Sequence, residues 1–421
     1  MKADFAIVHA AELATIRGPG RARAGPEMDD AGIVTDGAVA VRDGRIVAAG
    51  PTAEVLARLD GGFEKVDATG KLVTPGLVDP HVHLVFAGSR EKELEDMAVR
   101  KTPYLEIKAR GGGMPTTLEL TARTPTEELL RKTRGILDTM LIHGTTTIEA
   151  KSGYEMTYAG ELRQLEVIRT LSRTHPIGIV PTFLAQGIPF GFEDKVDQLS
   201  DEIAKVWLPE IARRGLAEYC DVFCEKGYYG VEQSRRIMAA GMGAGLKPRI
   251  HADWLGHSGG ARLGCELGVA SADHLIFTPK EEVDCLAGSG AVGVLLPTTP
   301  FAYLGTYADA RGIIGRGLPL ALGTDLSAAD MCESMQVMMA IATLQMKMTA
   351  AESLVAATHN AACSIGRGAE VGALEPGKAA DIVVFDAPSH RHFAYHYGVN
   401  LAERVYKGGK LVAEKGRRTG D

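Results

Sequence analysis

Apolar runs alternate with longer amphipathic stretches through the middle of the chain, between residues 75 and 372. Eight of these runs are short and almost continuously apolar, a pattern typical of strands that are buried on both faces. They cover residues 76–79, 145–150, 177–182, 219–224, 248–251, 271–274, 291–296 and 319–325. Because helical patterns separate the runs, the alternation predicts an α/β fold, a parallel (β/α)8 barrel of the TIM type.

Both ends of the chain carry short β-like runs that are separated by turn signals. At the N-terminal end they cover residues 5–8, 37–41, 45–49 and 71–73, and at the C-terminal end residues 380–385 and 403–412. Neither end has enough strands to bury a core alone. We therefore expect residues 1–74 and 373–421 to form one small composite β-sandwich beside a barrel of residues 75–372.

Composition narrows the class of protein. The 421 residues are 45% hydrophobic and 24% charged, as in globular proteins, and the net charge of −7 argues against a nucleic-acid partner. No apolar stretch approaches the roughly 18 residues of a membrane span, and the first residues do not form a secretory signal. We expect a cytoplasmic protein without a membrane partner. Six cysteines are too sparse for a disulfide framework, and Cys220 and Cys224 fit reduced packing residues.

Ionisable residues stand at the far ends of the predicted barrel strands. His81 and His83 follow the first run, whereas His251, His274 and Asp325 end the fifth, sixth and eighth. The C-terminal strand ends of such a barrel form its active face, and a His-x-His pair in extended backbone points both rings to one side. Three imidazoles and a carboxylate suit a divalent ion. We expect one ion, zinc first and iron second, bound by His81, His83, His251 and Asp325.

A metal ion in this place would supply hydrolytic chemistry. It lowers the pKa of a bound water toward about 7. Asp325 can accept a proton from that water as well as bind the ion, and His274 can stabilise or protonate a tetrahedral intermediate. A single histidine at a strand end is more often structural. The expectation of a metal site therefore depends on all four proposed ligands occurring together.

Several motifs resemble those of the imidazolonepropionases, the ring-opening amidohydrolases of histidine breakdown. They lie at residues 74–90, 111–113, 149–154, 220–225 and 271–275, and the resemblance runs through nearly the whole chain. The segment Pro-Gly-Leu-Val-Asp-Pro-His is shared across the amidohydrolases, whereas Lys-Ser-Gly-Tyr and Ser-Ala-Asp-His-Leu are narrower.

The resemblance implies that one metal ion activates water to open a cyclic amide with a propionate arm. It implies that Arg90 and Tyr154 contact this small carboxylated heterocycle, since the forked donors of Arg90 suit a carboxylate. Backbone at residues 111–113 could approach the ligand. A homodimer is expected. Lys151 is either part of the active site or a partner in a structural ion pair. Glu225 could bridge a second metal ion.

Three positions depart from the family pattern. Gln186 stands where the family has a substrate-binding histidine, and Trp254 where it has Glu or Gln. Asp325 is followed by Leu326 and Ser327 in place of Asn-Pro-Gly. Glutamine cannot titrate as histidine does, and Trp254 offers an apolar face with a single N–H donor. We expect Gln186, Trp254 and Ser327 to contact the ring of the substrate.

These departures favour an altered ring. Our leading hypothesis is a metal-dependent hydrolase for a five-membered cyclic amide or thioamide ring with a propionate arm, for example a 2-thioxo (thiohydantoin) ring. A true imidazolonepropionase that forms N-formimino-glutamate is the second hypothesis. A heterocycle deaminase is the third, although Trp254 occupies the place of its usual glutamate. The last is an inactive barrel that serves as a binding protein.

Overall fold

Eight parallel strands form a barrel in the part of the chain that the computed structural model describes, residues 1–189 and 191–420. The strands are β6 (Leu77–Val82), β7 (Thr145–Lys151), β8 (Gly178–Ala185), β9 (Tyr219–Cys224), β10 (Lys247–Ala252), β11 (Ser271–His274), β12 (Val292–Leu295) and β13 (Leu320–Leu322). Each overlaps one predicted run. Strands β6, β7 and β9 are buried along their whole length, which explains their continuous apolar character. The predicted TIM-type barrel is confirmed.

The residues that follow β13 close the barrel against β6. The Asp325 amide donates to the His81 carbonyl over 3.1 Å, and the His83 amide donates to the Leu326 carbonyl over 2.9 Å. Val82 and Leu326 form a parallel bridge between these hydrogen bonds. Closure of the barrel therefore brings the His-x-His pair and Asp325 side by side.

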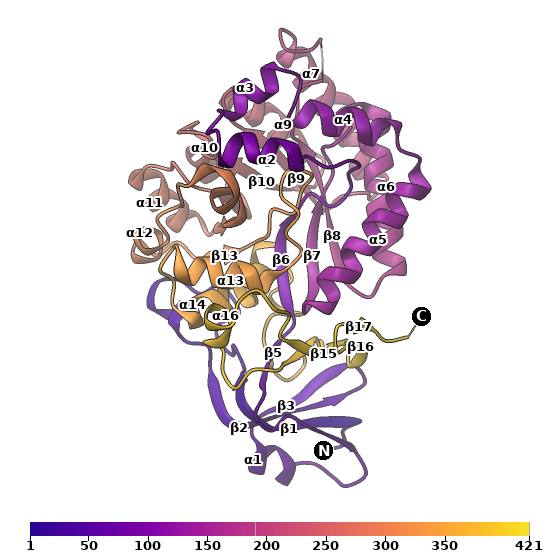
Figure 1. Cartoon of the computed structure of the whole chain (residues 1–421), viewed down its shortest axis with the longest axis vertical. Coiled ribbons are helices and arrows are strands. Elements are labelled where there is room, and N and C mark those ends of the chain that lie inside the picture. Colours follow the sequence, from indigo (N-terminus) through magenta and orange to yellow (C-terminus); the bar gives the residue numbers. More distant parts are fainter. Residues whose placement is uncertain (190, 421) are drawn as a thin grey trace.

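Helices surround the barrel, and the first three that follow β6 lie at its carboxyl-terminal end (Figure 1). After β6 come α2 (Glu91–Ala98), α3 (Tyr104–Ala109), α4 (Met114–Arg123) and α5 (Thr126–Ile142). The next connections contain α6 (Tyr158–Thr174), α7 (Val196–Glu202), η2 (Ile203–Trp207), α8 (Leu208–Arg213) and α9 (Val231–Gly243). The remaining ones contain α10 (Gly260–Leu267), α11 (Lys280–Ser289), η3 (Pro300–Leu304), α12 (Ala310–Gly315), α13 (Met335–Leu344), α14 (Ala350–Ala356) and α15 (His359–Ser364). None of the described helices combines the length and apolar character that a membrane crossing requires.

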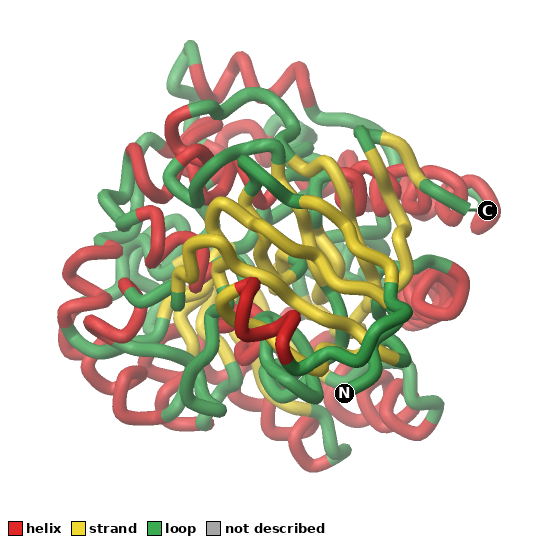
Figure 2. Tube along the Cα trace, turned by 90° about the horizontal axis from the view of Figure 1, so that it is seen from below, coloured by secondary structure: helices red, strands yellow, loops and turns green. Residues whose placement is uncertain are grey.

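The two ends of the chain share one mixed sheet at the base of the barrel (Figures 1 and 2). Its strands are β1 (Phe5–Ala14), β2 (Ile33–Arg42), β3 (Arg45–Pro51), β4 (Glu64–Asp67), β5 (Leu72–Pro75), β14 (Ile382–Phe385), β15 (Ala402–Lys407), β16 (Lys410–Glu414) and β17 (Arg417–Arg418). Short helices η1 (Gly25–Asp29), α1 (Thr52–Ala57) and α16 (His392–Tyr395) accompany it. Strand β14 pairs antiparallel with β5 and joins the two ends. Hydrogen bonds link all of these strands into a single sheet with apolar clusters on both faces.

The cysteines differ in one respect from the sequence-based expectation. Cys220 and Cys224 are buried thiols, as predicted. Cys265 and Cys285, however, form a disulfide with their Cα atoms 5.8 Å apart. The bond joins α10 to α11, two helices that follow neighbouring strands and pack together. Proximity of this kind comes from the barrel order and has no local sequence signal.

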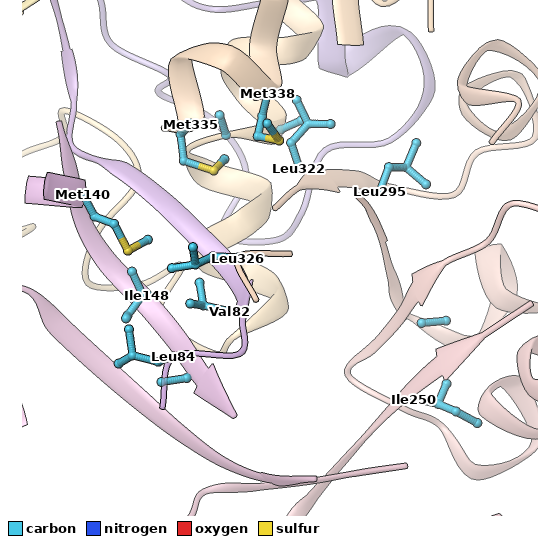
Figure 3. Close-up of a cluster of buried hydrophobic side chains, with 14 of the residues drawn as sticks. Val82, Leu84, Met140, Ile148, Ile250, Leu295, Leu322, Leu326, Met335 and Met338 are labelled. Atoms are coloured by element: carbon cyan, nitrogen blue, oxygen red, sulfur yellow. The ribbon is translucent and has the colours of Figure 1, made fainter. Parts of the chain in front are cut away.

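Side chains that point outward from the barrel strands pack against the surrounding helices. Figure 3 shows Val82, Ile148 and Leu326 close to Met140 of α5, and Leu322 close to Met338 of α13. All of them are fully buried. This layer holds the strands, and with them the site residues at the strand ends, in fixed positions.

We expect Ile148→Ala to destabilise the protein, because truncation of a fully buried side chain leaves a cavity that the packed layer cannot refill. The free energy of unfolding should fall by about 2–5 kcal/mol, measured by urea denaturation followed by circular dichroism. Val99→Ala, at a side chain that is 71% exposed, is the control and should change it by less than about 0.5 kcal/mol. Equal effects of both substitutions would contradict this account of the core.

Candidate active site

Four imidazoles and one carboxylate meet at the carboxyl-terminal end of the barrel. His81 Nε2 lies 3.3 Å from His83 Nε2, and Asp325 Oδ1 lies 3.5 Å and 3.3 Å from these two atoms. The ring of His251 is centred 4.5 Å from that of His81 and 5.3 Å from that of His274. The four predicted metal ligands and His274 are thus brought together. Each of the five is less than one-tenth exposed.

Two buried carboxylates hold the outer nitrogens of two of these histidines. His81 Nδ1 is 2.7 Å from Asp273 Oδ2, and His251 Nδ1 is 3.1 Å from Asp221. A carboxylate can only accept, so each Nδ1 carries the proton and each Nε2 keeps its lone pair. Sequence reasoning missed Asp221 and Asp273, although an acid inside an apolar strand was a usable signal.

The arrangement fits a metal cation. Ligand atoms of His81, His83 and Asp325 lie within 4.8 Å of one another, as do those of His81, His251 and His274. The lone pair on His81 Nε2 therefore lies 3.5 Å from Asp325 Oδ1, and His251 Nε2 has no hydrogen-bond partner although it is buried. Acceptors crowded together in this way repel one another unless a cation lies between them.

Electrostatics keeps the imidazoles in the form that binds metals. Burial lowers the pKa values of His81 and His83, and the positive charge of Lys151 lowers that of His81 further. Burial also lowers the pKa of His274 to about 3, so this ring is neutral at pH 7. Burial would raise the pKa of Asp325, but hydrogen bonding and charge from His83, with a further contribution from His274, lower it to about 2. Neutral imidazoles and an ionised carboxylate are the ligand forms.

Backbone strain is concentrated at the site. His274, Leu275 and Asp325 have φ angles of 77°, 56° and 54°, in the left-handed region that residues with side chains rarely adopt. Such conformations cost of order 1–3 kcal/mol each and persist only where the surroundings impose them. Here the strand ends and the closure of the barrel impose them, and they direct His274 and Asp325 toward the other imidazoles.

One pocket contains both the imidazole cluster and Arg90. It contains a cavity of about 50 Å³, which has room for several water molecules or a small ligand. Its lining comprises His83, Arg90, Tyr104, Met114, Tyr154, Gln186, Phe223, His251, Trp254, His274, Asp325, Ser327 and Ala329. All five residues predicted to contact a substrate are present. Tyr104 and Met114 come from the long connection after β6 and had no local signal, and the glycines at 111–113 are absent from the lining.

Arg90 supplies a buried positive charge in the pocket. Its Nε donates to Glu93 Oε2 over 2.8 Å, whereas its buried Nη2 has no partner. Burial alone would lower the pKa of the guanidinium, but Tyr104 and Glu93 beside it raise the pKa above its usual value. Arg90 therefore stays charged, with one donor available to a ligand.

Tyr154, Ser327 and Gln186 line the polar part of the pocket. Burial raises the pKa of Tyr154 to about 12, so its hydroxyl stays protonated. Gln186 Oε1 is buried without a partner and lies 2.8 Å from where a Cβ on Gly153 would stand. Gly153 has φ of 115°, so the position requires glycine for both its backbone and its close approach to Gln186.

Trp254 packs among other aromatic rings of the pocket lining. Its ring centroid lies 5.7 Å from that of Tyr104, 5.5 Å from that of Phe223 and 5.8 Å from that of His274. Its backbone amide donates to Glu225 Oε2 over 2.9 Å, but its buried Nε1 has no acceptor. Trp254 thus presents a planar face and one unused N–H donor.

Glu225 and Lys151 contact protein groups. Glu225 Oε2 also accepts from the Leu255 amide, and its Oε1 accepts from the Lys226 amide. Lys151 Nζ donates to Glu149 and Asp221 over 2.9 and 2.8 Å, below the imidazole cluster. Lys151 thus makes the structural ion pairs that were one of its two interpretations. A bridging role of Glu225 in a second metal site has no support in these contacts.

Comparison with known proteins agrees with this geometry. A model of the amidohydrolase family matches residues 274–412, and a model of the imidazolonepropionase-like composite domain of bacteria matches residues 37–59. An imidazolonepropionase from Alkaliphilus metalliredigens (strain QYMF) is 42% identical over 421 residues, 99% of this chain and 100% of the relative. One from Geobacillus thermodenitrificans (strain NG80-2) is 45% identical over 417 residues, 98% of each chain.

Solved structures share the fold at low sequence identity. A zinc-bound adenosine deaminase from Xanthomonas campestris has a TM-score of 0.72 and 20% identity, covering 99% of this chain and 94% of its own. A triazine hydrolase variant has a TM-score of 0.73 and 17% identity, covering 99% and 96%.

The barrel, the cluster at its strand ends and the family match define a metal-dependent amidohydrolase. Within that class, the full-length relatives place the chain more narrowly. It belongs to the imidazolonepropionase family.

We expect Glu225→Gln to loosen the Trp254 segment without changing the metal content. An amide in place of the carboxylate leaves a buried N–H without an acceptor, which costs about 1–3 kcal/mol. With Trp207→Phe as background, Trp254 is the single tryptophan, and its emission should shift to the red as water reaches the ring. Glu232→Gln, at an exposed carboxylate, is the control. A lower metal-to-protein ratio in Glu225→Gln would instead identify Glu225 as a ligand.

Proposed function

We propose that this chain hydrolyses a five-membered cyclic amide ring that carries a carboxylate arm, with imidazolonepropionate as the first candidate substrate. A single observation carries the proposal: one pocket holds the imidazole cluster and the buried cation Arg90 together. A small ring with an acidic arm can therefore reach both at once. The names of the full-length relatives support imidazolonepropionate as that ring.

We propose His81, His83, His251 and Asp325 as the ligands of one divalent ion, with zinc as first choice and iron as second. Imidazole nitrogens and a carboxylate oxygen suit both metals. When bound, the ion supplies Lewis-acid chemistry and lowers the pKa of water toward about 7. Two of the four ligands are already oriented for this role by the carboxylates at their Nδ1 atoms.

The side chains of this protein perform the remaining steps. Asp325, ionised and held by the Thr299 hydroxyl over 2.8 Å, accepts a proton from the attacking water. His274 is neutral, so it stabilises the developing oxyanion by hydrogen bonding and cannot act as a strong acid at neutral pH. Arg90 holds the carboxylate arm. Tyr154, protonated, and Ser327 donate hydrogen bonds within the same pocket.

An altered ring is the second candidate, and the unused donor of Trp254 favours it. A substrate that leaves this buried N–H unpaired forfeits binding free energy, whereas an exocyclic oxygen or sulfur on the ring could accept from it. A 2-thioxo ring with the same arm has such an acceptor. The comparisons give no support to a thioxo substrate, so it ranks below imidazolonepropionate.

The pocket gives less support to a heterocycle deaminase or to an inactive binding protein. Asp325 is the only acid among the lining residues that the structure describes, so a deaminase would lack a separate carboxylate to move protons. An inactive binding protein would have no need for the oriented imidazoles, and metal analysis of the purified protein tests this directly.

The proposal is tested by a paired turnover assay on zinc-loaded protein. Imidazolonepropionate and its 2-thioxo analogue are offered separately, and ring absorbance and released sulfide are followed. We expect turnover of imidazolonepropionate with a kcat/KM above about 10⁴ M⁻¹s⁻¹, as for typical enzymes. Turnover of the thioxo ring alone would favour the second candidate. Turnover of neither by stoichiometrically metallated protein would overturn the proposal.

We expect Arg90→Lys to raise KM and leave the metal content unchanged. Lysine keeps the charge but loses the fork that matches a carboxylate, and loss of one charged hydrogen bond of about 1.5–3 kcal/mol lowers kcat/KM about 10–100-fold. Lys108→Met, which removes a nearby half-buried cation outside the pocket lining, is the control. An unchanged KM in Arg90→Lys would place the carboxylate arm elsewhere.

A further inference from the structure

Lys151 has no part in the chemistry described above, yet it is completely buried beneath the imidazole cluster. Its Nζ lies 2.8 Å from Asp221 Oδ2, 2.9 Å from Glu149 Oε1 and 3.8 Å from Asp273 Oδ2. One ammonium group therefore contacts three carboxylates in the barrel interior. Removing a lysine from water is costly, so a position of this kind needs a reason.

Arg249 is the second fully buried cation at this level of the barrel. Its Nη2 donates to Asp273 Oδ2 over 3.1 Å and to the Pro80 carbonyl over 2.8 Å, and its Nη1 donates to the Ser364 carbonyl over 3.2 Å. The planar guanidinium is thereby fixed against the strand that carries His81.

Two parallel chains of contacts lead from these cations to the candidate metal ligands. Lys151 contacts Asp221, which binds His251 Nδ1, and Arg249 contacts Asp273, which binds His81 Nδ1. In each chain the cation contacts the same carboxylate as the imidazole and so fixes the position of that carboxylate. The Ser271 hydroxyl also holds Asp273, by donating to its Oδ1. The imidazole then presents its Nε2 lone pair to the centre of the cluster.

The two cations also link the buried carboxylates to one another. Lys151 Nζ contacts both Asp221 and Asp273, and Arg249 contacts Asp273 and lies 3.9 Å from Glu149 Oε1. Opposite charges at such distances attract one another more strongly in a buried site than in water. Asp79, which is also buried, accepts from Thr324 and makes no contact with either cation among the described hydrogen bonds and ion pairs.

We propose that Lys151 and Arg249 are positioning residues of the metal centre. They hold Asp221 and Asp273 so that His251 and His81 point their Nε2 lone pairs at the ion. This inference rests on the metal site proposed above.

The experiment measures zinc affinity of the apoprotein by competition with a chromogenic chelator. Removal of a buried positive charge near the site would by itself tighten the binding of a cation. We expect the opposite from Lys151→Met, a loss of about 10–100-fold, since loss of an outer contact of a ligand has that effect. Lys378→Met is the control, because it removes a largely buried lysine whose described hydrogen bonds go to the Gly368 and Val371 carbonyls, away from the cluster. It should leave the affinity within about twofold.

A double-mutant cycle separates positioning from general loosening of the barrel. If Lys151 acts through Asp221, the double variant Lys151→Met/Asp221→Asn should lose no more affinity than Asp221→Asn alone. Additive losses, or unchanged affinity in Lys151→Met with a lowered melting temperature of the apoprotein, would overturn the proposal. If Lys151→Met does not fold, Arg249→Lys tests the second series of contacts, which runs from Arg249 through Asp273 to His81. Lysine keeps the positive charge but cannot hold Asp273 and the Pro80 carbonyl together. We expect weaker zinc binding in this variant, and unchanged binding would contradict the proposal. A wild-type protein that binds no stoichiometric zinc would overturn the metal site itself.

Discussion

The hydrogen bonds from His81 Nδ1 to Asp273 and from His251 Nδ1 to Asp221 constrain everything else at the site. Imidazoles crowded into a dry barrel end are useful to a metal only when they are neutral and their free nitrogens converge. Burial supplies neutrality, as the lowered pKa of His81 indicates, but it does not select the nitrogen that keeps the lone pair. The carboxylates make that selection. Because they emerge from barrel strands, β9 and β11, the rigidity of the sheet is transmitted to the rings.

Closure of the barrel determines where Asp325 lies relative to His81 and His83. Asp325 lies beyond the last residue of β13, and its backbone is tied to His81 by the same hydrogen bonds that join the last strand to the first. Fold and site are therefore coupled: the barrel cannot close without bringing this carboxylate beside the His-x-His pair. The left-handed backbone at Asp325 and His274 is the local cost of that coupling, and the packed layer behind the strands sustains it.

The parts of this structure that could be predicted from the sequence are those with a local physical cause. A strand buried on both faces must be apolar along its length, so all eight barrel strands gave a signal, and His251 and Asp325 were found because polar residues there end an apolar run. Strand β4, with the exposed sequence Glu64–Asp67, lacked that signal. Tyr104 reaches the pocket from a connection whose path depends on long-range packing, and no periodicity in the chain encodes such a path.

The selectivity of the pocket depends on two residues: Glu225, which fixes the backbone at Trp254, and Trp254, whose side chain lines the pocket. Glu225 is absent from the pocket lining, and its oxygens accept from the backbone amides of Trp254, Leu255 and Lys226. The Glu225 carboxylate thus fixes the backbone at Trp254 and Leu255, and the Trp254 side chain offers its indole N–H as a donor. Trp254 and Gln186 both line the pocket, so a bound ring can meet the indole N–H of the one and the amide of the other. Selection between rings therefore depends on where they carry acceptors, while Arg90 selects for the arm whatever the ring.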